Sequence, residues 1–226
     1  MMDTVSREAI RSDFDRLARL QQDGWDHNSA YHDYLLRQLP ARCAQALEIG
    51  CGAGAFARLL AARAGHVLAL DFSPEMIRVA CERSTGHKNI DYQVVDITEW
   101  GWPAGRFDCI ASIATLHHLP LEETLSRMRH ALRQGGVILV LDLYRAEGLR
   151  GCTLSALACP VNMVLRLVKT GRFRDPEPLR AAWAAHAPRD AYATLAQIHC
   201  ACTSVLPGAR VRRHWFWRYS IVWQKP

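Results

Sequence analysis

The stretch LEIGCGAG, residues 47–54, decides the fold of this chain. An apolar strand over 46–49 runs into three glycines, and a helical pattern follows over 55–64. Glycine is needed where the backbone turns tightly and approaches a ligand with no Cβ in the way. A second apolar run at 67–71 then completes a strand–helix–strand unit, which predicts a parallel sheet.

The same alternation continues downstream. Ser73 followed by Pro74 marks the start of a helix, predicted over 75–83. Further strands are expected at 92–95, 107–113 and 137–143, with a helix over 121–132 and a glycine turn between the last two elements. The aromatic-rich end, 210–223, alternates and predicts a β-hairpin on the sheet edge. We therefore predict an α/β fold with a doubly wound, mostly parallel, seven-stranded sheet and an antiparallel C-terminal hairpin strand.

The remaining segments predict helices around this sheet. Apolar residues recur at helical spacing over 6–22 and 29–39, before Pro40 ends the pattern. The apolar stretch 152–168 is interrupted by Pro160, Asn162 and Arg166 and is too short for a bilayer span, so it is interpreted as a cap or lid helix. We expect one domain over 1–226, divided into an N-terminal helical lid (1–40), a cofactor-binding core (43–145), a helical substrate cap (146–206) and C-terminal strands (207–226).

Composition narrows the class of protein. The net charge is +6 over 226 residues and the basic residues are scattered, which does not favour a nucleic-acid surface. The eight cysteines form no CxxC pair, and the charged N-terminal stretch has no apolar signal region. A cytoplasmic protein that acts on a small molecule, without a membrane partner, is therefore predicted; the sequence does not indicate the oligomeric state.

Two cofactor classes fit the glycine loop. Gly50, Gly52 and Ala55 also satisfy a dinucleotide pattern, with Asp71 at a suitable distance for a ribose. Gly54, however, gives the GxGxG spacing, and Glu48 places a carboxylate where a cationic amine is attracted and a pyrophosphate is repelled. With acids at the ends of two further strands, Asp71 and Asp96, these features favour S-adenosylmethionine.

Five segments in order, ALEIGCGAG, LALDFSPEMI, VVDIT, FDCIASIATLHHL and LRQGGVILVLDLY, resemble the class I S-adenosylmethionine-dependent methyltransferases, especially the small-molecule group called type 11. The resemblance covers about residues 43–145 and implies a Rossmann-like fold and methyl transfer with S-adenosylhomocysteine as product. It also implies a set of cofactor contacts. The methionine moiety would lie against Gly50, Cys51, Gly52 and Gly54 near Glu48; the ribose would lie at Asp71; Asp96 and Ile97 would bracket the adenine near Phe72 and Met76; Ile113 would bind the methionine amino group; and Tyr31 would close over the cofactor.

Chemistry at the methyl group requires positioning and, for an acidic nucleophile, removal of a proton. His117 and His118 follow the fourth strand, at the edge where open α/β sheets bind ligands, and either is a candidate base. Candidate substrate contacts are Trp25, His27, Asp142, Tyr144, His186 and Asp190. No metal site is predicted, because His117 and His118 are adjacent and the carboxylates lack a ligand spacing.

The acceptor atom stays open among oxygen, sulfur, ring nitrogen and carbon. Enzymes that methylate exocyclic amines resemble one another in an Asn/Asp-Pro-Pro-aromatic run, and this chain has none after the fourth strand. Two alternatives remain at this point: an RNA methyltransferase, and a protein that binds S-adenosylmethionine without transferring its methyl group.

Overall fold

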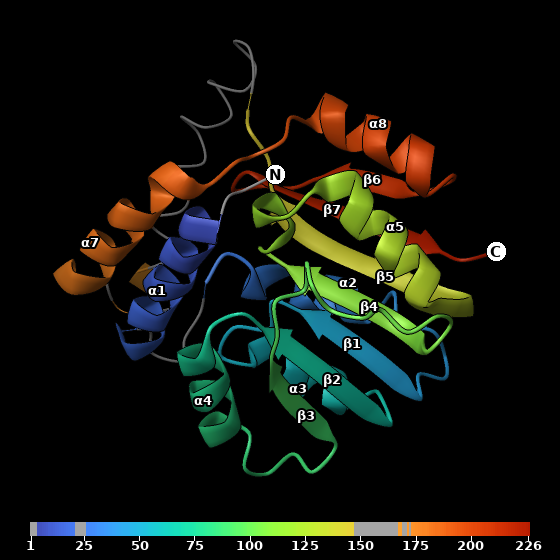
Figure 1. Ribbon diagram of the computed structural model, residues 1–226, viewed down its shortest axis with the longest axis horizontal. Coiled ribbons are helices and arrows are strands. Elements are labelled where there is room, and N and C mark those ends of the chain that lie inside the picture. Colours follow the sequence, from blue (N-terminus) through green and yellow to red (C-terminus); the bar gives the residue numbers. More distant parts are fainter. Residues whose placement is uncertain (1–3, 21–25, 147–166, 169–170, 172) are drawn as a thin grey trace.

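The computed structural model describes residues 4–20, 26–146, 167–168, 171 and 173–226. Within that part of the chain, seven strands form one sheet in the order β3-β2-β1-β4-β5-β7-β6 (Figure 1). The strands are β1 (Gln45–Ile49), β2 (His66–Asp71), β3 (Ile90–Val94), β4 (Phe107–Ile113), β5 (Leu132–Leu143), β6 (Arg210–Arg213) and β7 (Arg218–Gln224). Strands β1 to β5 pair in parallel, and β7 is antiparallel to both β5 and β6. The predicted fold class is confirmed.

Two details of the sheet differ from the sequence prediction. Strand β5 begins at Leu132 rather than at residue 137, and the glycine pair expected as a turn lies inside it. A register shift opposite Phe107 and Cys109 accommodates the extra residues, with Gly135 at a φ of +75° that favours glycine. The hairpin was predicted to lie on the edge of the sheet. Its strand β7 instead lies inside the sheet, paired along its length with β5, and only its strand β6 forms the edge.

Helices cover both faces of the sheet, as Figure 1 shows. On one face α5 (Leu121–Ala131) and α8 (Leu195–Val205) share an apolar cluster with the sheet residues Leu47, Ile49 and Leu68. On the other face α2 (His32–Leu36) and α3 (Ala55–Ala61) pack on Ala46, Val67 and Ala69. Because strand side chains alternate between faces and both faces are covered, the central strands are apolar throughout.

A third layer forms beside α4 (Pro74–Arg83). Helix α1 (Thr4–Leu20) packs its apolar side, including Leu17 and Ala18, between α4 and α7 (Glu177–His186). Figure 1 shows α1 and α7 side by side next to α4. The helix predicted over 29–39 is shorter, a turn of 3₁₀ helix (Ser29–Tyr31) followed by α2.

The helix predicted over 152–168 lies outside the described residues except for its last two positions. None of the described helices has both the length and the apolar character needed to cross a bilayer.

Candidate functional site

The glycine loop after β1 has the backbone geometry that its sequence predicts. Gly50, Gly52 and Gly54 have φ values of +68°, +52° and +76°, a region that other residues enter only with strain. A Cβ added to Gly50 would overlap the side chain of Thr115 after β4, so only glycine fits there. At Gly52, by contrast, no described atom lies within 4 Å of an added Cβ. A Cβ added to Gly54 would likewise overlap the hydroxyl of Tyr92, so the loop packs tightly at both ends and borders open space in the middle.

Asp71, at the end of β2, fixes this loop in place. Its Oδ2 accepts a hydrogen bond from the backbone N–H of Gly52 at 2.8 Å, and its Oδ1 accepts one from Ser73 at 2.9 Å. Burial raises the pKa of Asp71, and the backbone N–H groups of Ser73 and Gly52 oppose that rise. A carboxylate oxygen accepts more than one hydrogen bond, so each oxygen keeps capacity for a ligand hydroxyl.

Glu48 lies beneath the loop and is buried, with 2% of its surface exposed. Its Oε2 has no hydrogen-bond partner among the described residues. Burial, and then the nearby charge of Asp71, raise the pKa of Glu48 well above its usual range. Two carboxyl groups thus share a partly dry region beside the glycine loop, which suits a positively charged ligand group.

Replacing Glu48 with glutamine should stabilise the ligand-free protein by about 1–3 kcal/mol at neutral pH. Because the folded-state pKa is raised, the wild type loses stability as pH rises above the ordinary carboxyl pKa, and E48Q should lose this slope. Denaturant unfolding at several pH values from about 5 to 8 measures both effects.

The same E48Q substitution should weaken the binding of S-adenosylhomocysteine in calorimetry by about tenfold, or about 1.4 kcal/mol, if the carboxylate faces its amino group. Glu122→Gln, at an exposed position on α5, is the matched control and should change neither quantity. Unchanged affinity in E48Q would remove Glu48 from the binding site.

Helix α1 covers the ends of β2 and β3 through residues one helical turn apart. Nη1 of Arg7 lies 2.9 Å from Oδ2 of Asp96, and the Arg11 guanidinium lies 5.9 Å from the ring centre of Phe72. On the next turn, Asp15 accepts a hydrogen bond from the hydroxyl of Ser73 at 2.6 Å. The predicted lid is therefore in contact with two of the positions where the resemblance implies ribose and adenine contacts, Asp96 and Phe72, and with the neighbouring Ser73.

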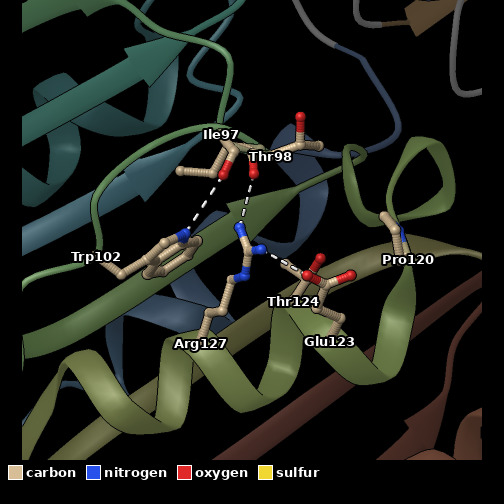
Figure 2. Close-up of a pocket in the computed structure, with 7 residues that line it drawn as sticks. All are labelled: Ile97, Thr98, Trp102, Pro120, Glu123, Thr124 and Arg127. Atoms are coloured by element: carbon tan, nitrogen blue, oxygen red, sulfur yellow. Dashed lines mark hydrogen bonds and ion pairs between the residues drawn. The ribbon is translucent and has the colours of Figure 1, made fainter. Parts of the chain in front are cut away.

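The other two residues predicted to contact the adenine, Met76 and Ile97, are fixed by apolar packing. Met76 is buried between α4 and α1 in the third apolar layer. Ile97 is also buried and lines a shallow pocket beside α5 (Figure 2). As Figure 2 shows, Nε1 of Trp102 donates to the Ile97 carbonyl at 3.3 Å, and Nη1 of Arg127 donates to the Thr98 carbonyl at 2.8 Å. These two bonds fix the backbone of the loop after β3.

Three further residues predicted to contact the cofactor, Ile113, Cys51 and Tyr31, lie apart from the adenine positions. Ile113 ends β4, and its carbonyl accepts a hydrogen bond from the hydroxyl of Thr115 at 3.0 Å. Cys51 is buried in the loop, and burial raises the pKa of its thiol well above the usual range. The hydroxyl of Tyr31 donates to the carbonyl of Trp215 at 3.1 Å, which ties the second predicted helix to the turn between β6 and β7.

His117 lies in the 3₁₀ turn Leu116–His118, directly after β4. Asp142, near the end of the neighbouring strand β5, approaches Nδ1 of His117 to 2.6 Å and also accepts its backbone N–H at 2.8 Å. Because a carboxylate only accepts hydrogen bonds, the neutral imidazole carries its hydrogen on Nδ1 and has its lone pair on Nε2. Thr115, two residues earlier, contacts Gly50, so this turn lies against the glycine loop.

The structure brings His118, His186 and Asp190 to the same place. Nε2 of His186 lies 3.2 Å from Oδ1 of Asp190, and Nδ1 of His186 lies 3.1 Å from Asp13 on α1. Burial works to lower the pKa of His186, but hydrogen bonds with Asp190 and Asp13 outweigh it, so the pKa is raised. Burial, and then the neighbouring His117, lower the pKa of His118 to about 3. His118 is therefore neutral at physiological pH.

The remaining predicted substrate residues lie at the hairpin or outside the described chain. The ring of His27 meets that of Phe216 at 4.8 Å, and the backbone N–H of Tyr144 donates to Trp217 at 3.1 Å. Trp25 lies outside the described residues. The sequence analysis missed Asp13, which contacts His186, because a single polar residue on a helix carries no pattern of its own.

Known proteins share this fold and this order of segments. A family model described as a methyltransferase domain matches residues 46–136. The ubiquinone biosynthesis O-methyltransferase of Xylella fastidiosa (strain 9a5c) is 30% identical over 207 residues, covering 82% of this chain and 80% of the relative. Two solved structures are similar in fold. The N-methyltransferase NodS from Bradyrhizobium japonicum WM9, in complex with S-adenosylhomocysteine, has a TM-score of 0.64, 19% identity and 98% coverage of both chains. The DhpI complex with S-adenosylhomocysteine has a TM-score of 0.65, 20% identity and full coverage of both.

The sheet order, the glycine loop after β1 and the acid at the end of β2 define a nucleoside-binding α/β enzyme of the Rossmann-like class. Together with the relative that matches across most of both chains, they show that this chain belongs to the class I S-adenosylmethionine-dependent methyltransferases. It is a methyltransferase, and S-adenosylmethionine is its cofactor.

Proposed function

We propose that this enzyme transfers a methyl group from S-adenosylmethionine to a hydroxyl oxygen of a small molecule. The observation that carries this proposal is the His117–Asp142 pair, which leaves the Nε2 lone pair of His117 free beside the glycine loop. A hydroxyl is a poor nucleophile until its proton is removed, so a buried, oriented imidazole is the group that such an acceptor needs.

The residues around the glycine loop fit the cofactor. The open space at Gly52 suits the methionine moiety, Glu48 its amino group and Asp71 the ribose hydroxyls. Further proposed contacts are Gly50, Cys51, Gly54, Phe72, Met76, Asp96, Ile97, Ile113 and Tyr31. Arg7 already occupies Oδ2 of Asp96, and Thr98 donates twice to Oδ1, so adenine recognition at Asp96 requires Arg7 to share or release this oxygen.

In the reaction, the cofactor supplies a methyl group on a positively charged sulfur. His117 would accept the acceptor's hydroxyl proton at Nε2, and the oxygen so activated would take the methyl group that the bound cofactor supplies. Asp142 holds the imidazole by Nδ1 and stabilises the imidazolium that forms, as the carboxylate does in serine-protease triads. The products are the methyl ether or ester, S-adenosylhomocysteine and one proton, which His117 returns to solvent.

Oxygen is favoured over nitrogen by two independent features. The relative that matches 82% of this chain is named as an O-methyltransferase. A neutral amine, in addition, already has a free lone pair and gains less from a base. The likeness to an N-methyltransferase structure concerns the fold at 19% identity and does not weigh against this.

The acceptor is proposed to enter between the 3₁₀ turn Leu116–His118 (η2) and the end of α7. Asp142, His186 and Asp190 surround the candidate bases His117 and His118, whereas His27, Trp25 and Tyr144 are proposed as outer contacts from the lid and the hairpin side. A cytoplasmic setting is part of the proposal. The six free cysteines among the described residues support it, because free thiols persist in reducing compartments.

A panel assay with methyl-labelled S-adenosylmethionine tests the proposal. Phenols, catechols and carboxylic acids are compared with amines, thiols and unmodified transfer RNA, and the products are identified by mass spectrometry. We expect label on oxygen of one or more small molecules. Label only on amines, thiols or RNA would overturn the oxygen assignment, and tight cofactor binding with no transfer to any member would favour the non-methylating alternative.

A further inference from the structure

Three imidazole nitrogens converge on one carboxylate oxygen between the sheet and the cap. Nε2 of His117 and Nε2 of His118 each lie 3.7 Å from Oδ1 of Asp190, and Nε2 of His186 lies 3.2 Å from the same atom. These side chains come from η2 after β4, from the end of α7, and from the residue after the 3₁₀ turn Ala187–Arg189. All four are at most 10% exposed.

Hydrogen bonding within the protein does not explain this arrangement. A separation of 3.7 Å is too long for a hydrogen bond, so neither His117 nor His118 bonds through Nε2 to Oδ1 of Asp190, and only His186 approaches that oxygen closely, at 3.2 Å. The Nε2 of His117 presents a lone pair, because Asp142 fixes its hydrogen on Nδ1. A lone pair therefore faces a carboxylate oxygen with no hydrogen between them, which favours a positive charge in the space they share.

The spacing matches that of ligands around a metal ion. Zinc lies about 2.0–2.1 Å from imidazole nitrogen and carboxylate oxygen, which puts neighbouring tetrahedral ligands about 3.4 Å apart. The separations from Oδ1 of Asp190 to Nε2 of His117 and to Nε2 of His118, 3.7 Å each, lie near that value. Single atoms of His117, His118 and Asp190 also lie within 4.8 Å of one another.

The groups behind these ligands are those that metal sites use. Metal-binding histidines usually donate their other ring N–H to a carboxylate, which orients the ring and fixes the tautomer. His117 has Asp142 at Nδ1. Asp190 is oriented in the same way, since His186 lies 3.2 Å from its Oδ1 and the hydroxyl of Tyr192 donates to its Oδ2.

We propose that His117, His118 and Asp190 form a binding site for a divalent transition-metal ion, with zinc as the best fit, and that His186 positions Asp190. Two imidazoles with one carboxylate are a known zinc ligand set that leaves the fourth tetrahedral position open. The sequence predicts no metal site because the two adjacent histidines lack a recognised spacing, and only the fold adds Asp190 and its partner His186.

Three protein ligands leave a tetrahedral ion one open position, which water can fill. The ion links η2 on the sheet to the turn that follows α7, and therefore joins the cap to the core. It also occupies Nε2 of His117, so, resting on the proposed function, we expect a bound ion to inhibit methyl transfer.

Cobalt(II) is the probe for the test, because four-coordinate cobalt absorbs visible light strongly and thiolate ligands add a near-ultraviolet band. The chelator-treated full chain is titrated with cobalt. We expect one equivalent to give the four-coordinate spectrum without the thiolate band, and zinc to displace it. A weak six-coordinate spectrum, or a thiolate band from exposed Cys81 or Cys200, would overturn the proposal.

Variants locate the ion. His118→Ala and Asp190→Asn should each weaken cobalt binding at least about 100-fold, and His186→Gln, which removes the ion-pair partner of Asp190, about 10–100-fold. His199→Ala, an exposed histidine on α8, is the matched control and should bind as the wild type does. Equal binding by the wild type and His118→Ala would overturn the site. Circular dichroism and S-adenosylhomocysteine affinity show whether each variant is folded.

The methyl-transfer assay separates this proposal from the proposed function. The spectra alone test cobalt binding at this cluster, whatever the result of the methyl-transfer assay. Activation by the ion, in place of inhibition, would keep the metal site and remove His117 from the role of base.

Discussion

His117→Gln should lower kcat by about 10²–10⁴-fold with the acceptor that the panel identifies, in the presence of a chelator. Glutamine can still donate a hydrogen bond to Asp142, which is 1% exposed, so the carboxylate keeps a partner and the fold is preserved. It has no lone pair of suitable basicity to take the acceptor's proton. Steady-state and single-turnover rates measure the loss.

Two comparisons make this result specific. Affinity for S-adenosylhomocysteine should stay within about twofold, because His117 is not assigned to the cofactor. His118→Gln should lower kcat by less than about tenfold, since burial and the neighbouring His117 keep the pKa of His118 near 3 and make it a weak base. Full activity in His117→Gln, or an equal loss in both variants, would contradict the assignment of the base.

Gly52→Ala should weaken the binding of S-adenosylmethionine and S-adenosylhomocysteine by at least about 30-fold, or about 2 kcal/mol. The added methyl group enters space where no described atom lies within 4 Å, which is where the methionine moiety is proposed to bind. The φ of +52° also disfavours alanine and costs about 1–2 kcal/mol of stability. Calorimetry measures the affinity, and denaturant unfolding measures the stability.

Gly105→Ala separates these two effects. Gly105 lies before β4 with a φ of +55°, and an added Cβ there also meets no atom within 4 Å. It should therefore lose a similar amount of stability and keep its cofactor affinity. If both variants bind S-adenosylhomocysteine as the wild type does, the glycine loop is not the cofactor site. Gly50→Ala is less informative, because overlap with Thr115 would disturb folding as well.

Much of the fold follows from local patterns. The five parallel strands end within a few residues of their predicted ends, and Ser73 caps α4 through its hydroxyl as expected. The least accurate boundary is the start of β5, because the pairing of Leu132 with Phe107 depends on a neighbouring strand. A glycine pair has the same local pattern whether it forms a turn or a bulge.

The features of the site likewise divide into those that local sequence sets and those that tertiary structure sets. The amino-acid sequence by itself determined the glycine loop, the acids after β2 and β3 and the histidine pair after β4. Each of these features depends only on a few adjacent residues, which set the backbone conformation of the loop or place a side chain at the end of a strand. Tertiary structure alone decided that Arg7 pairs with Asp96 and that Tyr31 is tied to the β6–β7 turn.

Tertiary structure also decided the surroundings of His117. The strand order places Asp142 of β5 beside it, and the docking of α7 brings His186 and Asp190 across from about 70 residues away in the sequence. Such contacts depend on which apolar faces pack together over the whole chain. No local pattern specifies them, and so the chemistry that surrounds the acceptor became visible only in the folded protein.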